Sequence, residues 1–245
     1  MKSAAFSPAG IERRMTWKTA YRSLYYATAP EPETPVLNPA QTALLVIDVQ
    51  NTYLERPDRS TLSPADQVQY DLWTPFHTRM QTQVIPGTAA LLAKARAAGM
   101  ECIFARIACH TDDGRDRSLS QKLPGWNNLL LPKRGVPGQI VPSLQPIGDE
   151  IEVTKTTDSA LTGTNLRLIL HNLGIKTVIC TGIFTDQCVS STVRSLADES
   201  FGVIVLEDLC AAGSDALHHQ ELEVINMIYC HVMTSQELVQ IMALG

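Results

Sequence analysis

Cys188 has the residue type and the position of an enzymatic nucleophile. It follows a short β-branched apolar run, residues 176–180, which is typical of a buried strand. The residues after it form the apolar stripe of an amphipathic helix: Val189, Val193, Leu196 and Ala197. Thr185 or Asp186 can accept hydrogen bonds as the cap of this helix, and the helix dipole then lowers the pKa of a thiol at its start. We therefore expect a reactive cysteine where a strand ends and a helix begins.

Asp48 and Lys155 also stand at the ends of apolar segments. Asp48 closes a nearly continuous apolar run that begins at Thr42, the pattern of a strand buried on both faces. Lys155 follows the short strand-like segment 150–154. The alternatives are a turn cap for Asp48 and a surface role for Lys155. We favour a functional role for both, because the carboxyl ends of parallel strands line the ligand crevice of doubly wound sheets.

Together, these three residue types have the chemistry needed to hydrolyse an amide. A cysteine attacks a carbonyl as the thiolate, so it needs a base or a neighbouring cation. Asp48 can take the thiol proton and return it to a leaving amine. Lys155 can stabilise the thiolate and keep Asp48 ionised. Backbone amides at the start of the helix can bind the developing oxyanion, each contributing about 3 kcal/mol in known enzymes.

A structural role is the alternative interpretation for any single cysteine, because free cysteines are among the most buried residues. Four others stand inside or beside apolar runs: Cys102, Cys180, Cys210 and Cys230. The six cysteines show no CxxC pair, so neither a disulfide framework nor a zinc ribbon is indicated. His110 and its neighbouring carboxylates are weak evidence for a metal site. We expect no metal, no cofactor and a reducing, cytoplasmic environment.

Length and composition indicate one α/β enzyme domain preceded by an arm. The chain has 245 residues, 44% of them hydrophobic, and a net charge of −5, so it can bury a full core but offers no basic face to nucleic acid. No segment predicts a membrane span or a signal peptide. Residues 1–40 predict an arm and a proline-rich linker, packed on a neighbouring subunit or on its own domain. Residues 41–245 form the domain, where strands alternate with helices in parallel βαβ units.

The expected elements place the remaining candidates. Strands are predicted over residues 42–50, 100–107, 150–154, 176–180, 202–206 and 231–234. Residues 51–84 lack periodicity, and we expect either a lid or substrate wall, or a partly helical surface excursion. The residues expected to contact a small-molecule substrate are Asn51, Tyr53, Trp73, Phe76, Arg106, His110 and Thr185. Among these, Arg106 would suit a substrate carboxylate.

Three segments, taken together and in order, resemble the isochorismatase-like cysteine hydrolases. They are LVIDVQN (45–51), KTTDSALTGTNL (155–166) and TGIFTDQCV (181–189). The resemblance spans about residues 40–240 and implies a Rossmann-like, three-layer α/β/α fold around a six-stranded parallel sheet. It implies a catalytic triad of Asp48, Lys155 and Cys188, and a cis peptide before Phe184. It also implies an oxyanion hole built from the backbone amides of Phe184 and Cys188, and a homodimer or homotetramer.

Departures from the family pattern narrow the expected activity. The nicotinamidase branch carries an Asp-x-His metal motif after the second strand, and here the aligned residues 108–110 lack the Asp. Isochorismatases proper cleave a vinyl ether and commonly lack the nucleophilic cysteine, so Cys188 favours C–N hydrolysis. Leu161 stands where the family usually has Phe. We expect a metal-independent hydrolase of a small amide, ureido or carbamoyl compound, acting through a thioester. The alternatives are a vinyl-ether hydrolase and a catalytically silent binding protein.

Overall fold

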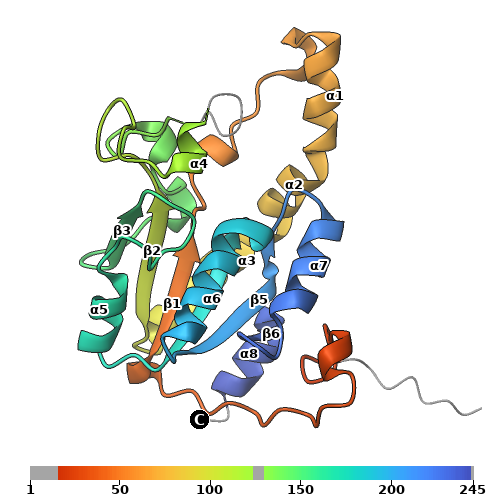
Figure 1. Ribbon diagram of the computed structural model, residues 1–245, viewed down its shortest axis with the longest axis vertical. Helices are drawn as coiled ribbons and strands as arrows, with labels where there is room; N and C mark the ends of the chain where they lie inside the picture. Colours follow the sequence, from red (N-terminus) through yellow and green to blue (C-terminus); the bar gives the residue numbers. More distant parts are fainter. Residues whose placement is uncertain (1–15, 124–129, 244–245) are drawn as a thin grey trace, which may run out of the picture.

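Six parallel strands form the central sheet, as predicted (Figure 1). The computed structural model describes residues 16–123 and 130–243. The strands are β1 (Thr42–Ile47), β2 (Glu101–Ile107), β3 (Ile151–Lys155), β4 (Thr177–Ile183), β5 (Gly202–Ala211) and β6 (His231–Met233). Their order across the sheet is β3-β2-β1-β4-β5-β6, and every neighbouring pair is parallel. The expected α/β architecture is confirmed.

Helices cover both faces of this sheet. They are α1 (Pro64–Leu72), α2 (Thr74–Arg79), α3 (Ile85–Ala97), α4 (Leu119–Lys122), α5 (Leu166–Asn172), α6 (Ser190–Asp198), α7 (Asp215–Ile225) and α8 (Ser235–Met242). Successive side chains of a strand point to opposite faces. Leu44 and Val46 of β1 therefore share a core with α3 and α8, whereas Leu45 and Ile47 share one with α5, α6 and α7. The result is the expected three-layer arrangement.

Three strands end three or more residues from their predicted ends. β4 continues to Ile183 instead of ending at Cys180. β1 ends at Ile47, because Asp48 adopts a left-handed backbone conformation with φ of 53°. β5 continues to Ala211 instead of ending at Leu206. The two acidic residues after Leu206 lie inside this longer strand, at the point where its pairing with β4 shifts register. An irregularity in the pairing lets a strand continue through such polar residues.

Residues 51–84 are largely helical, and Tyr53, Trp73 and Phe76 of this segment also line a cleft, so the segment has features of both expectations. Ser63 caps α1 by accepting a hydrogen bond from the amide of Asp66, and Pro64 occupies the first turn. A π-helical turn, Met80–Val84, then joins α2 to α3. Figure 1 shows α1 projecting away from the sheet, with α2 at its base. The segment forms one wall beside the carboxyl ends of the strands.

The described part of the N-terminal arm packs on its own domain. The amide of Trp17 donates to Glu237 Oε1 at 3.0 Å, and Asn226 Nδ2 donates to the carbonyl of Tyr21 at 2.9 Å. The arm includes a 3-10 turn, Leu24–Tyr26, and its first 15 residues lie outside the described residues. Of the two expectations, wrapping of the arm around its own chain is therefore the one seen here.

Gly182 is the point of closest approach between β4 and β1. Its φ is +117°, and a Cβ added there would lie 2.0 Å from the carbonyl oxygen of Ile47. Gly182 and Ile47 are register partners. Beyond them, β4 leads to Cys188 and β1 leads to Asp48. The missing side chain thus lets two strand ends lie close enough to share one site.

We expect Gly182→Ala to lower the free energy of unfolding by more than about 3 kcal/mol, because backbone atoms of β1 must move. Gly148→Ala is the matched control, since Gly148 has a φ of +65° but no atom within 4 Å of an added Cβ. It should cost only about 1 kcal/mol, from its backbone conformation. Urea unfolding followed by circular dichroism compares the two variants. Equal losses would contradict the close-approach argument.

Candidate active site

Asp48, Lys155 and Cys188 meet in one buried cluster at the carboxyl ends of the sheet. Lys155 Nζ lies 2.7 Å from Asp48 Oδ2 and donates to Cys188 Sγ at 3.3 Å. The relative exposures of Asp48, Lys155 and Cys188 are 1%, 0% and 6%. The fold therefore brings together all three residues that the strand-end pattern singled out.

The sheet order explains why a lysine occupies the third position. Lys155 ends β3, which is separated from β1 by β2, a span of two strand spacings of about 4.8 Å each. A long side chain must therefore cross the end of β2 to reach Asp48. The ammonium also donates to the carbonyl of Thr157 at 3.1 Å, which fixes its position beyond the strand. The backbone of Asp48 is held by the intervening strand β2, because its amide donates to the carbonyl of Ala105.

Burial and charge set the protonation of the cluster. Burial raises the pKa of Asp48, against the opposing effect of the Lys155 ammonium. Burial alone would lower the pKa of Lys155, but the charges of Asp48 and Cys188 outweigh it and leave that pKa raised. Burial raises the pKa of the Cys188 thiol well above its ordinary value, and the charge of Asp48 adds to this, although Lys155 opposes both. The thiol is therefore protonated at neutral pH.

This result corrects the expectation that a helix N-terminus lowers the pKa of Cys188. The segment Thr185–Val189 is a π-helical turn, and neither Thr185 nor Asp186 caps it with a side chain. Desolvation of the nearly buried thiol, together with the charge of Asp48, outweighs the favourable effect of Lys155 on the pKa of Cys188. A resting thiol needs a neighbouring base, and Asp48 lies beside it, because the Lys155 ammonium contacts both the Asp48 carboxylate and the Cys188 sulfur.

The turn that carries Cys188 begins at a cis peptide bond between Ile183 and Phe184. The carbonyl of Phe184 accepts hydrogen bonds from the amides of Gln187, at 3.0 Å, and Val189, at 3.1 Å. These bonds close the turn directly after β4. Cys188 therefore sits inside a hydrogen-bonded turn between β4 and α6.

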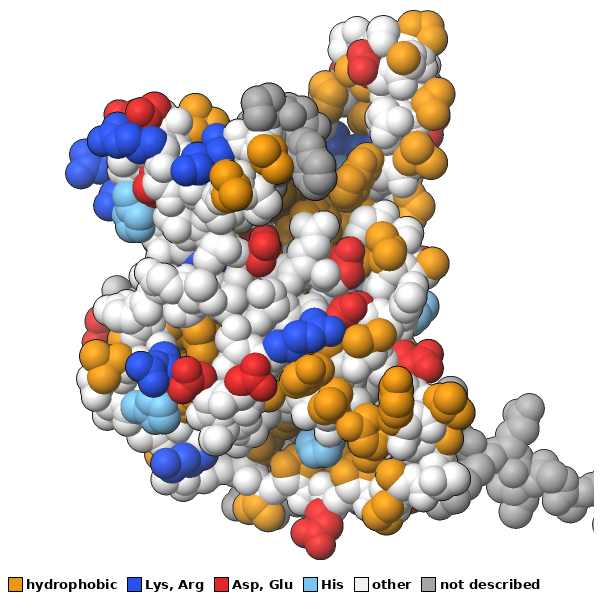
Figure 2. Space-filling model, in the orientation of Figure 1, with side chains coloured by type: hydrophobic (Ala, Val, Ile, Leu, Met, Phe, Trp, Pro, Cys, Tyr) orange, Lys and Arg blue, Asp and Glu red, His pale blue; other side chains and the backbone are white. Residues whose placement is uncertain are grey.

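A cleft of about 580 Å³ opens beside this turn. Its apolar lining is the aromatic set Tyr53, Trp73, Phe76 and Phe184. Its polar lining consists of Thr52, Glu55, His77, Ser120, Gln121, Asp158 and Gln187. Figure 2 shows this face hollowed between the projecting α1 and the lobe around α4, with hydrophobic side chains in the hollow and acidic ones below it. Three of the residues expected to contact substrate, Tyr53, Trp73 and Phe76, therefore line the cleft.

Asn51, Arg106 and His110 do not line the cleft. The side-chain Nδ2 of Asn51 donates to the carbonyl of Val136. Arg106 is buried and pairs with Glu152 on the neighbouring strand at 2.7 Å, because its side chain points across the sheet and not over its end. His110 borders a different cavity, which it shares with Lys133 and a group of exposed charged residues. These three residues support the loops and the sheet edge around the site.

Thr185 belongs to a buried network and not to the cleft lining. Its hydroxyl lies 2.8 Å from His218 Nδ1, and Arg79 donates to His218 Nε2 at 3.0 Å. Because arginine can only donate, Nε2 is the acceptor, and Nδ1 carries the hydrogen that is donated to Thr185. Burial, with the Arg79 charge adding to it, lowers the pKa of His218 to about 3, so the ring is neutral. The network connects α2 and α7 to the turn that holds Cys188.

Asp158 is the site residue that the sequence analysis overlooked. It lies three residues after Lys155, inside the quoted segment 155–166. Its Oδ1 accepts a hydrogen bond from Cys188 Sγ at 3.7 Å, and its side chain also lines the cleft. Its position just after the strand that ends at Lys155 could have indicated that it lies near the site. Glu55, Gln121 and Gln187 are further lining residues that no sequence pattern indicated.

Comparison with known proteins identifies the family. The model of the isochorismatase domain matches residues 42–237. The chain belongs to the isochorismatase family. Ureidoacrylate amidohydrolase RutB of Pantoea ananatis is 34% identical over 194 residues, which are 74% of this chain and 73% of the relative. RutB of Acinetobacter baylyi is 29% identical, over 85% of this chain and 86% of its own.

Solved structures of the isochorismatase family share the fold. A cysteine hydrolase from Pseudomonas syringae pv. phaseolicola has a TM-score of 0.70 at 22% identity, covering 86% of this chain and 97% of its own. N-carbamoylsarcosine amidase from Thermoplasma acidophilum has a TM-score of 0.59 at 19% identity, covering 80% and 96%. Across residues 16–123 and 130–243, no group of three or more His, Cys, Asp or Glu side chains is placed to hold a metal ion. Within the same ranges, no helix is long and apolar enough to cross a membrane.

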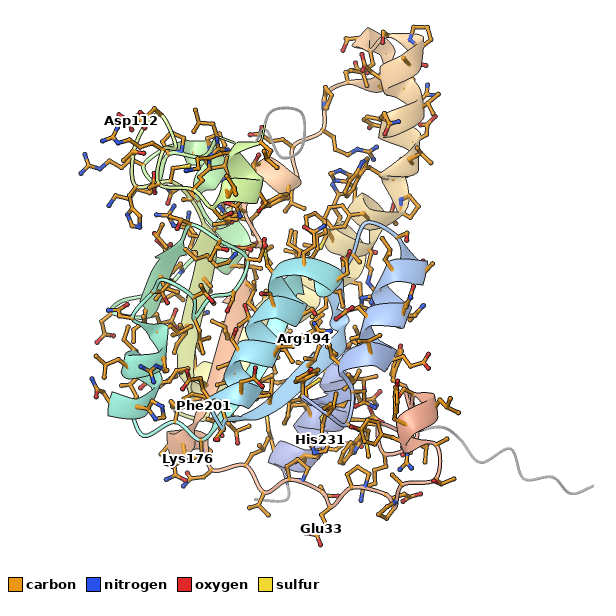
Figure 3. The ribbon with its side chains drawn as sticks, in the orientation of Figure 1. Glu33, Asp112, Lys176, Arg194, Phe201 and His231 are labelled. Carbon is orange, nitrogen blue, oxygen red and sulfur yellow. The ribbon has the colours of Figure 1, made fainter. Side chains whose placement is uncertain are left out.

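We expect Asp158→Asn to lower the pKa of the Cys188 thiol, because the negative charge of Asp158 is one of the groups that raise it. The rate of Cys188 alkylation by iodoacetamide should then reach half of its maximum at a lower pH than in the wild type. Mass spectrometry of the Cys188 peptide across a pH series measures this midpoint. Asp112→Asn, in the exposed loop labelled in Figure 3, is the control and should leave it in place. An unchanged or higher midpoint in Asp158→Asn would contradict the assignment.

Proposed function

We propose that this chain is a cysteine-dependent, metal-independent hydrolase of a C–N bond in a small amide, ureido or carbamoyl compound. The observation that carries the proposal is the buried contact of Asp48, Lys155 and Cys188 beside the cleft. The family supports it, because relatives are named ureidoacrylate amidohydrolase and a structural neighbour is named N-carbamoylsarcosine amidase.

The first half of the reaction forms a thioester. As Cys188 Sγ attacks the carbonyl carbon, its proton passes to Asp48, which contacts the same Lys155 ammonium as the sulfur. The raised pKa of Asp48 favours this transfer, since a carboxylate with a higher pKa is a stronger base. When the tetrahedral intermediate collapses, the C–N bond breaks and Asp48 gives the proton to the departing nitrogen. Ammonia or an amine leaves, and the acyl group stays on sulfur.

The second half of the reaction uses water. A water molecule attacks the thioester carbonyl while Asp48 takes one of its protons, and the C–S bond then breaks. The acid product leaves, and the proton on Asp48 returns to the Cys188 sulfur. Lys155 keeps its positive charge throughout, because its pKa is raised in the cluster. It balances the negative charge as this moves between sulfur and carboxylate.

The backbone amides of Phe184 and Cys188 are the proposed oxyanion hole. Both belong to the turn after β4, and Phe184 lines the cleft in which the carbonyl would lie. Amides that already point at the developing charge need no reorganisation during the reaction. Each such donor contributes about 3 kcal/mol of transition-state stabilisation in known enzymes.

The test is release of ammonia from a panel of small amides, ureas and carbamoyl amino acids. We expect Cys188→Ala and Asp48→Asn to lower kcat by about 10⁴-fold or more, because the nucleophile and its base act as a unit. Cys102→Ala is the matched control, since Cys102 is also a buried cysteine but lies near the opposite end of β2. It should keep wild-type turnover.

Full turnover by Cys188→Ala would end this proposal. Silence of the folded wild type across the whole panel would also count against C–N hydrolysis. Release of pyruvate from isochorismate by that same protein would replace the proposal with vinyl-ether cleavage. Circular dichroism spectra of all variants should match that of the wild type, which would exclude unfolding as the cause of lost activity.

A further inference from the structure

The fully charged side chains that line the cleft, among the described residues, are all negative. Among the described residues that line it, Glu55 and Asp158 are acidic, and none is Lys or Arg. His77 also lines the cleft, but burial lowers its pKa, with the nearby Arg56 charge adding to this, so it brings no positive charge at neutral pH. The lining thus presents two carboxylates to a ligand.

Basic residues near the cleft have other partners or lie elsewhere. Arg56 stacks 3.4 Å over the ring of Tyr70 and donates to the Tyr70 carbonyl at 2.6 Å. Arg117 does not line the cleft; it borders a neighbouring cavity of about 20 Å³, which shares Tyr53 and Gln121 with the cleft. Arg194 (labelled in Figure 3) lines another cavity, which shares Asp158 and Gln187 with the cleft, and it pairs with Glu221 at 2.8 Å. The Arg106 side chain, once a candidate for a substrate carboxylate, is held by Glu152.

The rest of the wall is aromatic. The ring of Phe184 lies 5.1 Å from Phe76, 5.5 Å from Tyr53 and 6.0 Å from Trp73, measured between centroids. Such rings carry negative charge on their faces and attract cations, most strongly in the case of Trp. An organic ammonium is attracted both to the faces of such rings and to carboxylates, and the cleft lining contains both kinds of group. A carboxylate ligand would instead meet repulsion from both acids.

We propose that the cleft selects a substrate whose far end, away from the scissile C–N bond, carries a positively charged amine. This rests on the proposed function for the reacting end, and names the class of substrate: an amino-alkyl urea or amide. Asp158 marks the reacting end of the cleft, because it touches the Cys188 thiol, and Glu55 supplies the second negative charge. The preference separates this chain from relatives named for ureidoacrylate, which is itself a carboxylate.

The test uses three ureas that share one reacting group and differ in the charge of the far end. They are 3-aminopropylurea, which is cationic, butylurea, which is neutral, and 3-ureidopropionate, which is anionic. We expect kcat/KM to be about tenfold higher for the cationic than for the neutral urea, and lowest for the anionic one. Fastest turnover of 3-ureidopropionate would overturn the inference and leave the proposed hydrolysis standing.

Glu55→Gln removes one charge at nearly constant shape. It should reduce the preference for the cationic over the neutral urea by about threefold or more, and raise the relative rate of the anionic one. Glu33→Gln is the matched control, because Glu33 is exposed at the opposite end of the molecule (Figure 3). It should leave all three rates unchanged. An unaltered preference in Glu55→Gln would overturn the inference.

Calorimetric titration of the three ureas into Cys188→Ala separates recognition from chemistry. Tightest binding of 3-aminopropylurea supports the inference even where the wild type hydrolyses none of the three, a result that would tell only against the proposed reaction. Absence of binding by 3-aminopropylurea, or tighter binding of 3-ureidopropionate, overturns the inference whatever the turnover.

Discussion

The buried ion pair between Lys155 and Asp48 is the interaction on which the rest of this site depends. Taking either charge out of water alone costs several kcal/mol, so neither side chain is stable in its place without the other. The pair joins the ends of two strands that are not neighbours, β3 and β1, and the lysine then extends to the cysteine after β4. The proposed nucleophile, base and cation are thus brought together by one buried ion pair, which the sheet order makes possible.

Much of this arrangement could be predicted from the sequence. Continuous apolar runs identified buried parallel strands, and parallel strands place their carboxyl ends at one edge. The meeting of Asp48, Lys155 and Cys188 follows from that rule, and the aromatic residues Tyr53 and Phe76 were also anticipated beside the cleft. The strand ends were less predictable. β5 continues past its two acidic residues because its pairing with β4 is irregular, and such irregularity has no periodic signal.

The direction and burial of single side chains could not be predicted. Arg106 stands near a strand end, yet its side chain pairs with Glu152 on β3. Alternation along the strand sets the face of the sheet to which the side chain points, and opposite charge selects Glu152 as its partner. The position of Cys188 in the chain suggested a reactive, acidified thiol, whereas its burial makes the thiol a weaker acid. Asp158 was overlooked because its importance comes from a contact across the fold with Cys188.

The network of Thr185, His218 and Arg79 has a mechanical consequence. Arg79 ends the helix that carries Phe76, and Thr185 begins the turn that carries Cys188. Hydrogen bonds to His218 therefore anchor both the aromatic wall and this turn. A wall that is already anchored loses little conformational entropy when a ligand enters. The same network therefore fixes the aromatic wall relative to the Cys188 sulfur before any ligand enters the cleft.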